Sequence, residues 1–215
     1  MDTNEKFVIT INREMGSGGR TVGEILAEKL GVPFYDKAVV KALTGKYNLS
    51  VESIERLKGL RHDWWSEFKR NMGIGQKMIN APEYYRSVMG EEPVMLTTDE
   101  MFEAESEIIK GMAAEESCII AGRLGFAVLK DHPNRLSILI QAPMEHRIER
   151  IMTKQGLSRE EASEAINKVD KMRENYVNFY AHTSRYDARN YDLVINMAGK
   201  TEDEVADLIL KYIKG

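Results

Sequence analysis

A glycine-rich segment near the start of the chain has the composition of a phosphate-binding loop. Gly16, Gly18 and Gly19 follow an apolar, β-branched stretch and precede a helical pattern. Glycines allow a tight turn in which several backbone N–H groups point inward, and a following helix adds the positive end of its dipole. The segment could also be an ordinary turn, but its place between a strand and a helix favours phosphate binding.

The loop departs from the pattern G-x-x-x-x-G-K-[ST] at the lysine. If Gly18 is the last glycine of the pattern, Gly19 takes the lysine position, and Arg20 and Thr21 follow. Arg20, or Arg13 at the start of the loop, could replace the lysine, because a guanidinium binds phosphate through a fork of N–H groups. Arg20 could instead be a solvated residue of the first helical turn. Thr21 is a candidate Mg²⁺ ligand or an ordinary helix residue.

The elements that must position this loop alternate between strand and helix. Helical patterns cover about 19–30, the residues from 97 onward, 158–180 and 201–215. The predicted strands are apolar on both faces, which predicts an α/β fold with a parallel sheet covered on both sides. Ligands of such sheets bind at the carboxyl ends of the strands. The predicted strands are KFVITIN (6–12), VPFYD (32–36), SCIIAG (117–122), RLSILIQA (135–142) and YDLVINM (191–197).

Two further candidates end predicted strands. Asp36 could hold Mg²⁺ or accept a hydroxyl proton, although a helix N-cap is an ordinary role for Asp. Arg123 stands at the expected ligand edge, with a structural ion pair as the alternative. The last helical pattern has one apolar face, formed by Val205, Leu208, Ile209, Tyr212 and Ile213.

Arg173 lies within an apolar stripe of the helix predicted at 158–180. A charge in such a stripe must reach solvent, form a pair or meet an anion. A pair with Asp170, three residues earlier, is the ordinary interpretation. Catalysis is favoured, because a transferring phosphoryl group needs cations around its oxygens. Four other nearby cations could also line a lid, but each alone is interpreted as a solvated charge: Lys168, Lys171, Arg185 and Arg189.

Composition excludes several classes of function. The 215 residues carry a net charge of −4, which gives no support to a nucleic-acid or membrane binder. No apolar run approaches the ~20 residues of a membrane span. Cys118 is the single cysteine, interpreted as a core residue, and the four histidines match no metal-ligand spacing. We therefore expect a cytoplasmic protein without disulfides.

Four segments together resemble the cytidylate kinase-like group of P-loop nucleoside monophosphate kinases. The resemblance implies a three-layer P-loop kinase fold: a five-stranded parallel sheet with helices on both faces, a helical insertion for the acceptor and a helical lid. It implies one domain over 1–215, with its core at about 1–36 and 96–215, the insertion at about 37–95 and the lid at about 158–190. The segments are ITINREMGSGGRTVGEILAEKLGVPFYDK, IIAGRLG, DKMRENY and NYDLVIN.

The resemblance also implies roles for single residues. Asp36 matches an acidic residue that faces Mg²⁺ or the acceptor, and Arg123 is similar to an arginine that touches the acceptor nucleotide. Ala121 and Leu124 stand where cytidylate kinases have acidic residues, which weakens the implication that the base is cytosine. Asp170 and Arg173 fall at the acidic and arginine positions of the lid. The donor-phosphate loop is matched by Gly16, Ser17, Gly18, Gly19, Arg20 and Thr21.

The main hypothesis is a kinase that uses ATP and Mg²⁺ to phosphorylate a nucleoside monophosphate or a similar small acceptor. In this hypothesis, Arg20, Arg123, Asp170 and Arg173 act at the transferring group. One alternative is a nucleotide- or phosphate-binding module with little or no transfer activity, suggested by the missing lysine. Another is a kinase of a non-nucleotide metabolite. A homodimer is left open, with the aromatic residues of the insertion as one place for the contact.

Overall fold

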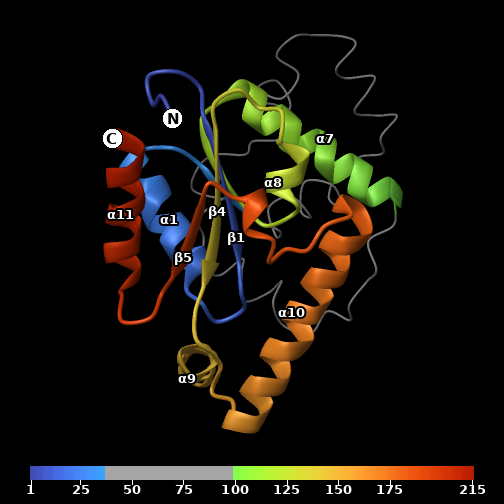
Figure 1. The fold of residues 1–215 in the computed structure, drawn as a ribbon, viewed down its shortest axis with the longest axis vertical. Coiled ribbons are helices and arrows are strands. Elements are labelled where there is room, and N and C mark those ends of the chain that lie inside the picture. The colour runs from blue at the N-terminus through green and yellow to red at the C-terminus, as the bar shows by residue number, and fades with distance from the viewer. Residues whose placement is uncertain (37–98) are drawn as a thin grey trace, which may run out of the picture.

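The structure, a computed structural model, describes residues 1–36 and 99–215 (Figure 1). Five strands form one parallel sheet in the order β2-β3-β1-β4-β5. The predicted five-stranded parallel sheet is therefore confirmed. The strands are β1 (Val8–Arg13), β2 (Phe34–Asp36), β3 (Cys118–Ala121), β4 (Arg135–Gln141) and β5 (Leu193–Asn196).

Helices follow the strands and begin or end at residues that favour those boundaries. Helix α1 ends at Gly31, which has the left-handed φ of 67° that glycine adopts without strain. Helix α10 begins with a capping box in which Ser158 and Glu161 satisfy each other's backbone N–H groups. The helices are α1 (Gly19–Leu30), α7 (Asp99–Glu115), α8 (Gly125–Val128), α9 (Met144–Gln155), α10 (Arg159–Ala181) and α11 (Glu202–Lys214), with a short 3₁₀ turn η1 at Ala188–Asn190.

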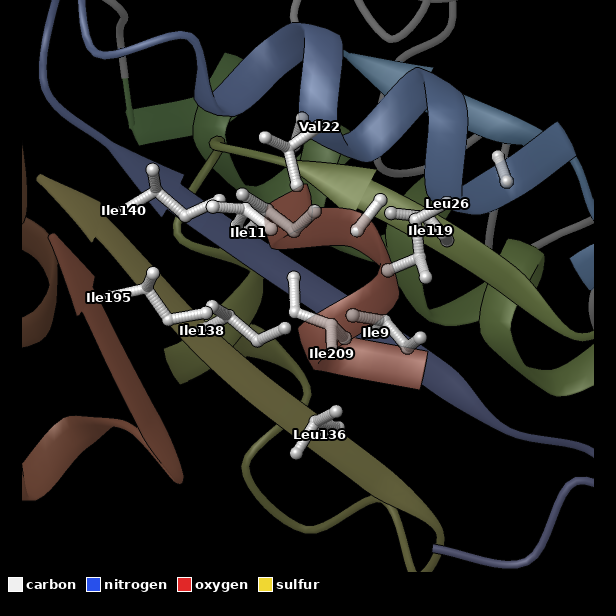
Figure 2. Close-up of a cluster of buried hydrophobic side chains, with 14 of the residues drawn as sticks. Ile9, Ile11, Val22, Leu26, Ile119, Leu136, Ile138, Ile140, Ile195 and Ile209 are labelled. Atoms are coloured by element: carbon white, nitrogen blue, oxygen red, sulfur yellow. The ribbon is translucent and has the colours of Figure 1, made fainter. Parts of the chain in front are cut away.

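The main core lies between the sheet and the two helices α1 and α11. Figure 2 shows Ile11 of β1 close to Val22 of α1, and Ile9 of β1 close to Ile209 of α11 in the same cluster. The opposite face of β1 meets α8, where a Cβ added at Gly125 would lie 3.3 Å from Thr10. Helices therefore cover both faces of the sheet, as predicted. None of the described helices is long and apolar enough to cross a membrane.

The apolar residues of α11 do not all enter the core. Val205, Ile209 and Ile213 are buried, whereas Leu208 and Tyr212 are 48% and 53% exposed. The single apolar face predicted for this helix is thus divided between the core and the protein surface. The predicted insertion at 37–95 and its aromatic residues lie outside the described residues. Thr97, where the next helical pattern begins in the sequence, lies outside them as well.

Candidate active site

The loop between β1 and α1 has the tight geometry that its glycines predict. Gly16 and Gly18 have φ values of 80° and 84°, in the left-handed region that favours glycine. A Cβ added at Gly16 would lie 2.8 Å from the carbonyl oxygen of Arg147, closer than real Cβ atoms come. Ser17 is fully buried, and its hydroxyl donates to the carbonyl of Glu14 at 2.9 Å. This hydrogen bond holds the loop together, and helix α1 begins at Gly19.

The position of the expected lysine has no room for a side chain. A Cβ added at Gly19 would lie 2.7 Å from the Cβ of Arg13 and 3.1 Å from the Cβ of Ile140. Because Arg13 fills this space, any cation that serves the loop must come from elsewhere. The missing lysine and the arginine at the start of the loop are one coupled feature.

Arg20 is held by two carboxylates. Its Nε donates to Asp36 at 3.2 Å, and its Nη2 lies 2.8 Å from Glu24, one helical turn further along α1. Asp36 ends β2 and is buried. Burial is also the main cause that raises the pKa of Glu24. Arg20 therefore links the first turn of α1 to the carboxyl end of β2.

Asp170 of α10 joins the segment predicted to form a lid to the loop. Its carboxylate accepts from Arg147 at 2.5 Å, from Arg185 at 3.3 Å and from the backbone N–H of Met15 at 3.0 Å. Arg173 lies 3.7 Å away on the next turn of the same helix. One buried carboxylate thus brings together three arginines from α9, α10 and the segment after α10. Figure 1 shows α9 and the start of α10 beyond the carboxyl end of β4.

Arg173, which the sequence predicts to be a cation for phosphoryl transfer, contacts the start of the loop. Its Nη1 donates to the carbonyl of Arg13 at 3.1 Å, and 36% of its side chain is exposed. Burial, followed by the charges of Arg13 and Arg185, lowers the pKa of Arg173 to about 9. The guanidinium stays protonated at neutral pH. A bound anion would interact favourably with it and with the neighbouring arginines.

Arg185 was predicted to be a solvated charge, and this prediction is wrong. The side chain is completely buried, paired with Asp170 and donating to the carbonyl of Arg13. Its backbone N–H donates to Glu174 at 3.1 Å. The exposed positions of Lys168, Lys171 and Arg189 agree with the solvated interpretation.

Arg147 and Arg150 are residues that the sequence reasoning did not single out. Arg150 donates to the hydroxyl of Thr21 at 3.2 Å and pairs with Glu202 at the start of α11. Arg147 lies against Gly16. A signal existed, because the segment QAPMEHR at the carboxyl end of β4 is one of the loops where ligands are expected. Two arginines three residues apart in the first turns of the next helix share a face that can point back to the loop.

Arg123 lies apart from this cluster, at the end of β3. Its guanidinium pairs with buried Glu105 of α7 and stands 5.7 Å from the ring centre of Tyr176 on α10. Burial lowers the pKa of Arg123. This geometry matches the structural ion pair that the sequence left as an alternative. Gly122, Arg123 and Leu124 have φ values of 84°, 50° and 56°, a strained run at the ligand edge. A role toward an acceptor stays a prediction.

The residue types around the loop fit a nucleotide phosphate. They also fit Mg²⁺ held jointly by protein oxygens and phosphate oxygens. Gly16 and Gly18 have positive φ values and lie against residues of α9 and α11: a Cβ added at Gly16 would meet Arg147, and one added at Gly18 would meet Glu202 and Arg150. Thr21 and Asp36 offer a hydroxyl and a carboxylate oxygen, and Mg²⁺ usually takes one or two protein ligands beside phosphate oxygens and water. The described part of the chain contains no group of three or more His, Cys, Asp or Glu that would hold a metal by itself.

Comparison with models of protein families shows which family this chain belongs to. The model of the cytidylate kinase-like family matches residues 8–199. The chain belongs to the cytidylate kinase-like family. The resemblance read from the four sequence segments is therefore confirmed.

A curated relative that is matched over nearly its whole length carries the same family name. A cytidylate kinase of Sulfolobus acidocaldarius is 24% identical over 210 residues, 95% of this chain and 93% of the relative. A Corynebacterium glutamicum protein named uronate isomerase is 33% identical over 99 residues; the match covers 46% of this chain and only 19% of that relative.

Among solved structures, an uncharacterized protein from Eubacterium ventriosum has a TM-score of 0.70 and 25% identity, covering 98% of this chain and 99% of the other. A shikimate kinase from Bacteroides thetaiotaomicron has a TM-score of 0.51 and 13% identity, covering 97% and 99%. The fold is that of the P-loop kinases.

Proposed function

We propose that this member of the family transfers the terminal phosphoryl group of ATP to a nucleoside monophosphate or a similar small acceptor. The observation that carries the proposal is the arginine cluster around the phosphate loop. Arg147, Arg150, Arg173 and Arg185 reach the loop or its neighbours from three segments after β4. A protein that transfers phosphoryl groups has to position two anions in line and neutralise their charge.

The residues divide this work according to their burial. The backbone of residues 16–21 would hold the donor phosphates, with Thr21 and Asp36 as ligands of Mg²⁺. When bound, Mg²⁺ supplies positive charge to the phosphate oxygens. Arg173, partly exposed, would reach the transferring group, and Arg123 would serve the acceptor. Buried Arg185 would hold the segment at 158–190 against the loop through Asp170.

We propose that Arg20 acts on the donor side of the site, but not from the position of a loop lysine. Its guanidinium is engaged by Asp36 and Glu24. We expect it to orient the carboxylate of Asp36 toward Mg²⁺ and to add positive charge near the first turn of α1. This arrangement would let an arginine contribute without entering the crowded position of Gly19.

Two other functions remain candidates on specific grounds. A binding module with little transfer activity is favoured by the crowding at Gly19, which excludes the usual cation. A kinase of a non-nucleotide metabolite is favoured by Ala121 and Leu124, which lack the carboxylates of cytidylate kinases. Both would share the donor loop with the proposed kinase.

The test is a coupled assay of ADP release with ATP and Mg²⁺ across CMP, dCMP, UMP, AMP, GMP and shikimate. Acceptor-dependent turnover that is lost in Arg173→Ala and reduced in Arg20→Ala supports the proposal. Arg189→Ala is the matched control, because Arg189 belongs to the same segment but is highly exposed and, among the described residues, pairs with its neighbour Asp187. ATP binding without turnover on any acceptor would favour the binding module instead.

A further inference from the structure

The edge of the sheet at β5 carries an apolar groove that the proposed chemistry does not use. Among the described strands, β5 pairs with β4 alone, so its other edge offers open backbone N–H and C=O groups. An open groove of about 340 Å³ follows this edge, lined by residues of β5, α11 and the segment between them. Figure 1 shows β5 and α11 on the side of the molecule away from α7 and α10.

The apolar side chains of this groove are exposed on both elements. Val194 of β5 is 46% exposed, and Leu208 and Tyr212 of α11 are exposed to a similar extent. Leu208 and Tyr212 are one helical turn apart, so they form a stripe beside the strand edge. Adjacent apolar groups of this size next to an unpaired strand are typical of a surface that another chain covers.

We propose that this surface binds a second copy of the chain in a two-fold dimer, with the two β5 strands paired antiparallel. A two-fold axis at the strand edge continues the sheet from one copy into the other. It also brings the two α11 helices together on the same face, running in opposite directions. Leu208 and Tyr212 of both copies then meet beside the joined strands.

The charges of α11 are self-complementary in this arrangement. Acidic residues occupy its first turn, and Lys211 and Lys214 its last turn. Glu204 precedes Leu208 by four residues and Lys211 follows it by three, and all three lie on neighbouring positions of the helix surface. Antiparallel helices that meet at Leu208 place Glu204 of each copy near Lys211 of the other. A uniformly acidic partner would be repelled by the first turn of α11, and a uniformly basic partner would be repelled by its last turn.

Sedimentation equilibrium of the full chain tests the proposal without reference to kinase activity. The wild type is expected to dimerise at micromolar concentration. Leu208→Lys is expected to raise the dissociation constant by about tenfold or more, the effect of losing a well-packed interface side chain. Phe179→Lys is the matched control, because Phe179 is the most exposed large apolar residue described and lies on α10, outside the groove.

A second pair of variants tests the orientation of the helices. Lys211→Glu is expected to weaken the dimer, because it faces Glu204 of the other copy. Lys214→Glu makes the same change of charge, but Lys214 is rotated about 240° around the helix from Leu208 and is expected to have little effect. A wild type that stays monomeric overturns the proposal and leaves the groove to a different partner. Equal dissociation by Phe179→Lys and Leu208→Lys overturns it as well, and circular dichroism of each variant identifies loss of fold.

Discussion

Arg13 and Gly19 depend on each other within the phosphate loop. The Cβ of Arg13 occupies the space that a side chain at position 19 would need. The guanidinium of Arg13 extends to the end of β3, where a Cβ added at Gly122 would collide with it. At the scale of single residues, the loop therefore has no room for a lysine side chain at position 19.

Introducing the usual lysine is expected to harm the protein. Gly19→Lys should lower the free energy of unfolding by about 1–3 kcal/mol, the range for overpacking a tight site, and should abolish ATP binding. Urea unfolding and titration calorimetry with ATP measure the two effects. The double variant Arg13→Gly/Gly19→Lys should regain part of the stability, because it removes the side chain that fills the space. Wild-type ATP affinity in the single variant would contradict the packing explanation.

Arg173 is expected to serve function at the expense of stability. Its folded pKa of about 9 lies below the ordinary value of 12.5, so its charge disfavours the folded state below pH 9. As the pH rises above 9, the folded state releases the proton before the unfolded chain does, and the penalty is relieved. Arg173→Met should therefore raise the melting temperature by a few degrees at pH 7, and this gain should shrink at pH 10.

Turnover is expected to change in the opposite direction. Arg173→Met should lose about 10³-fold or more in kcat, the range for removing an arginine at a transferring phosphoryl group. Wild-type turnover should fall above pH 9. Solvent reaches part of this side chain, so the stability change is expected to be small while the kinetic change is large. A variant that loses stability and keeps its turnover would show that Arg173 is structural.

At the scale of elements, α10 is the helix that we propose as the main part of a lid. Its first turn is fixed by Ser158 and Glu161, and its middle is fixed to the loop by Asp170. The cap is a local feature that the sequence predicts. The attachment through Asp170 depends on residues more than a hundred positions away in the chain.

Removing the cap is expected to weaken the helix without touching the site. Ser158→Ala should cost about 1 kcal/mol of the free energy of unfolding, because one backbone N–H at the helix start loses its acceptor. Thr153→Ala is the matched control, since its hydroxyl donates to the carbonyl of Glu149 one turn earlier in α9. Urea unfolding of both variants makes the comparison. Equal losses would show that the capping box contributes nothing of its own.

At the scale of the whole molecule, bound nucleotide is expected to fasten the loop, β2 and the lid together. ATP with Mg²⁺ at about 100 times its dissociation constant should add about 2.7 kcal/mol to the stability, or roughly 5–10 °C in the melting temperature. Thermal unfolding with and without ATP measures this shift. Chelation of Mg²⁺ by EDTA should abolish turnover and reduce the shift, and added Mg²⁺ should restore both. Turnover that persists in EDTA would exclude Thr21 and Asp36 as working metal ligands.

The sequence by itself determined the sheet, the phosphate loop and the family. Each of the five strands is a short apolar run, and the turn at Gly16 and Gly18 needs residues that tolerate positive φ. The cap at Ser158 and the stop at Gly31 are likewise written in neighbouring residues. Such features depend on contacts within a few positions, so periodicity and residue type are enough to predict them.

Tertiary structure alone decided which charges and which apolar residues are buried. Arg185 looks like a solvated cation in the sequence, but Asp170 and the carbonyl of Arg13 make its complete burial tolerable. Leu208 and Tyr212 look like core residues, but the sheet ends at β5 and leaves them at the surface. Burial depends on where distant segments meet, and a helical pattern does not tell which side of its apolar face will find a partner.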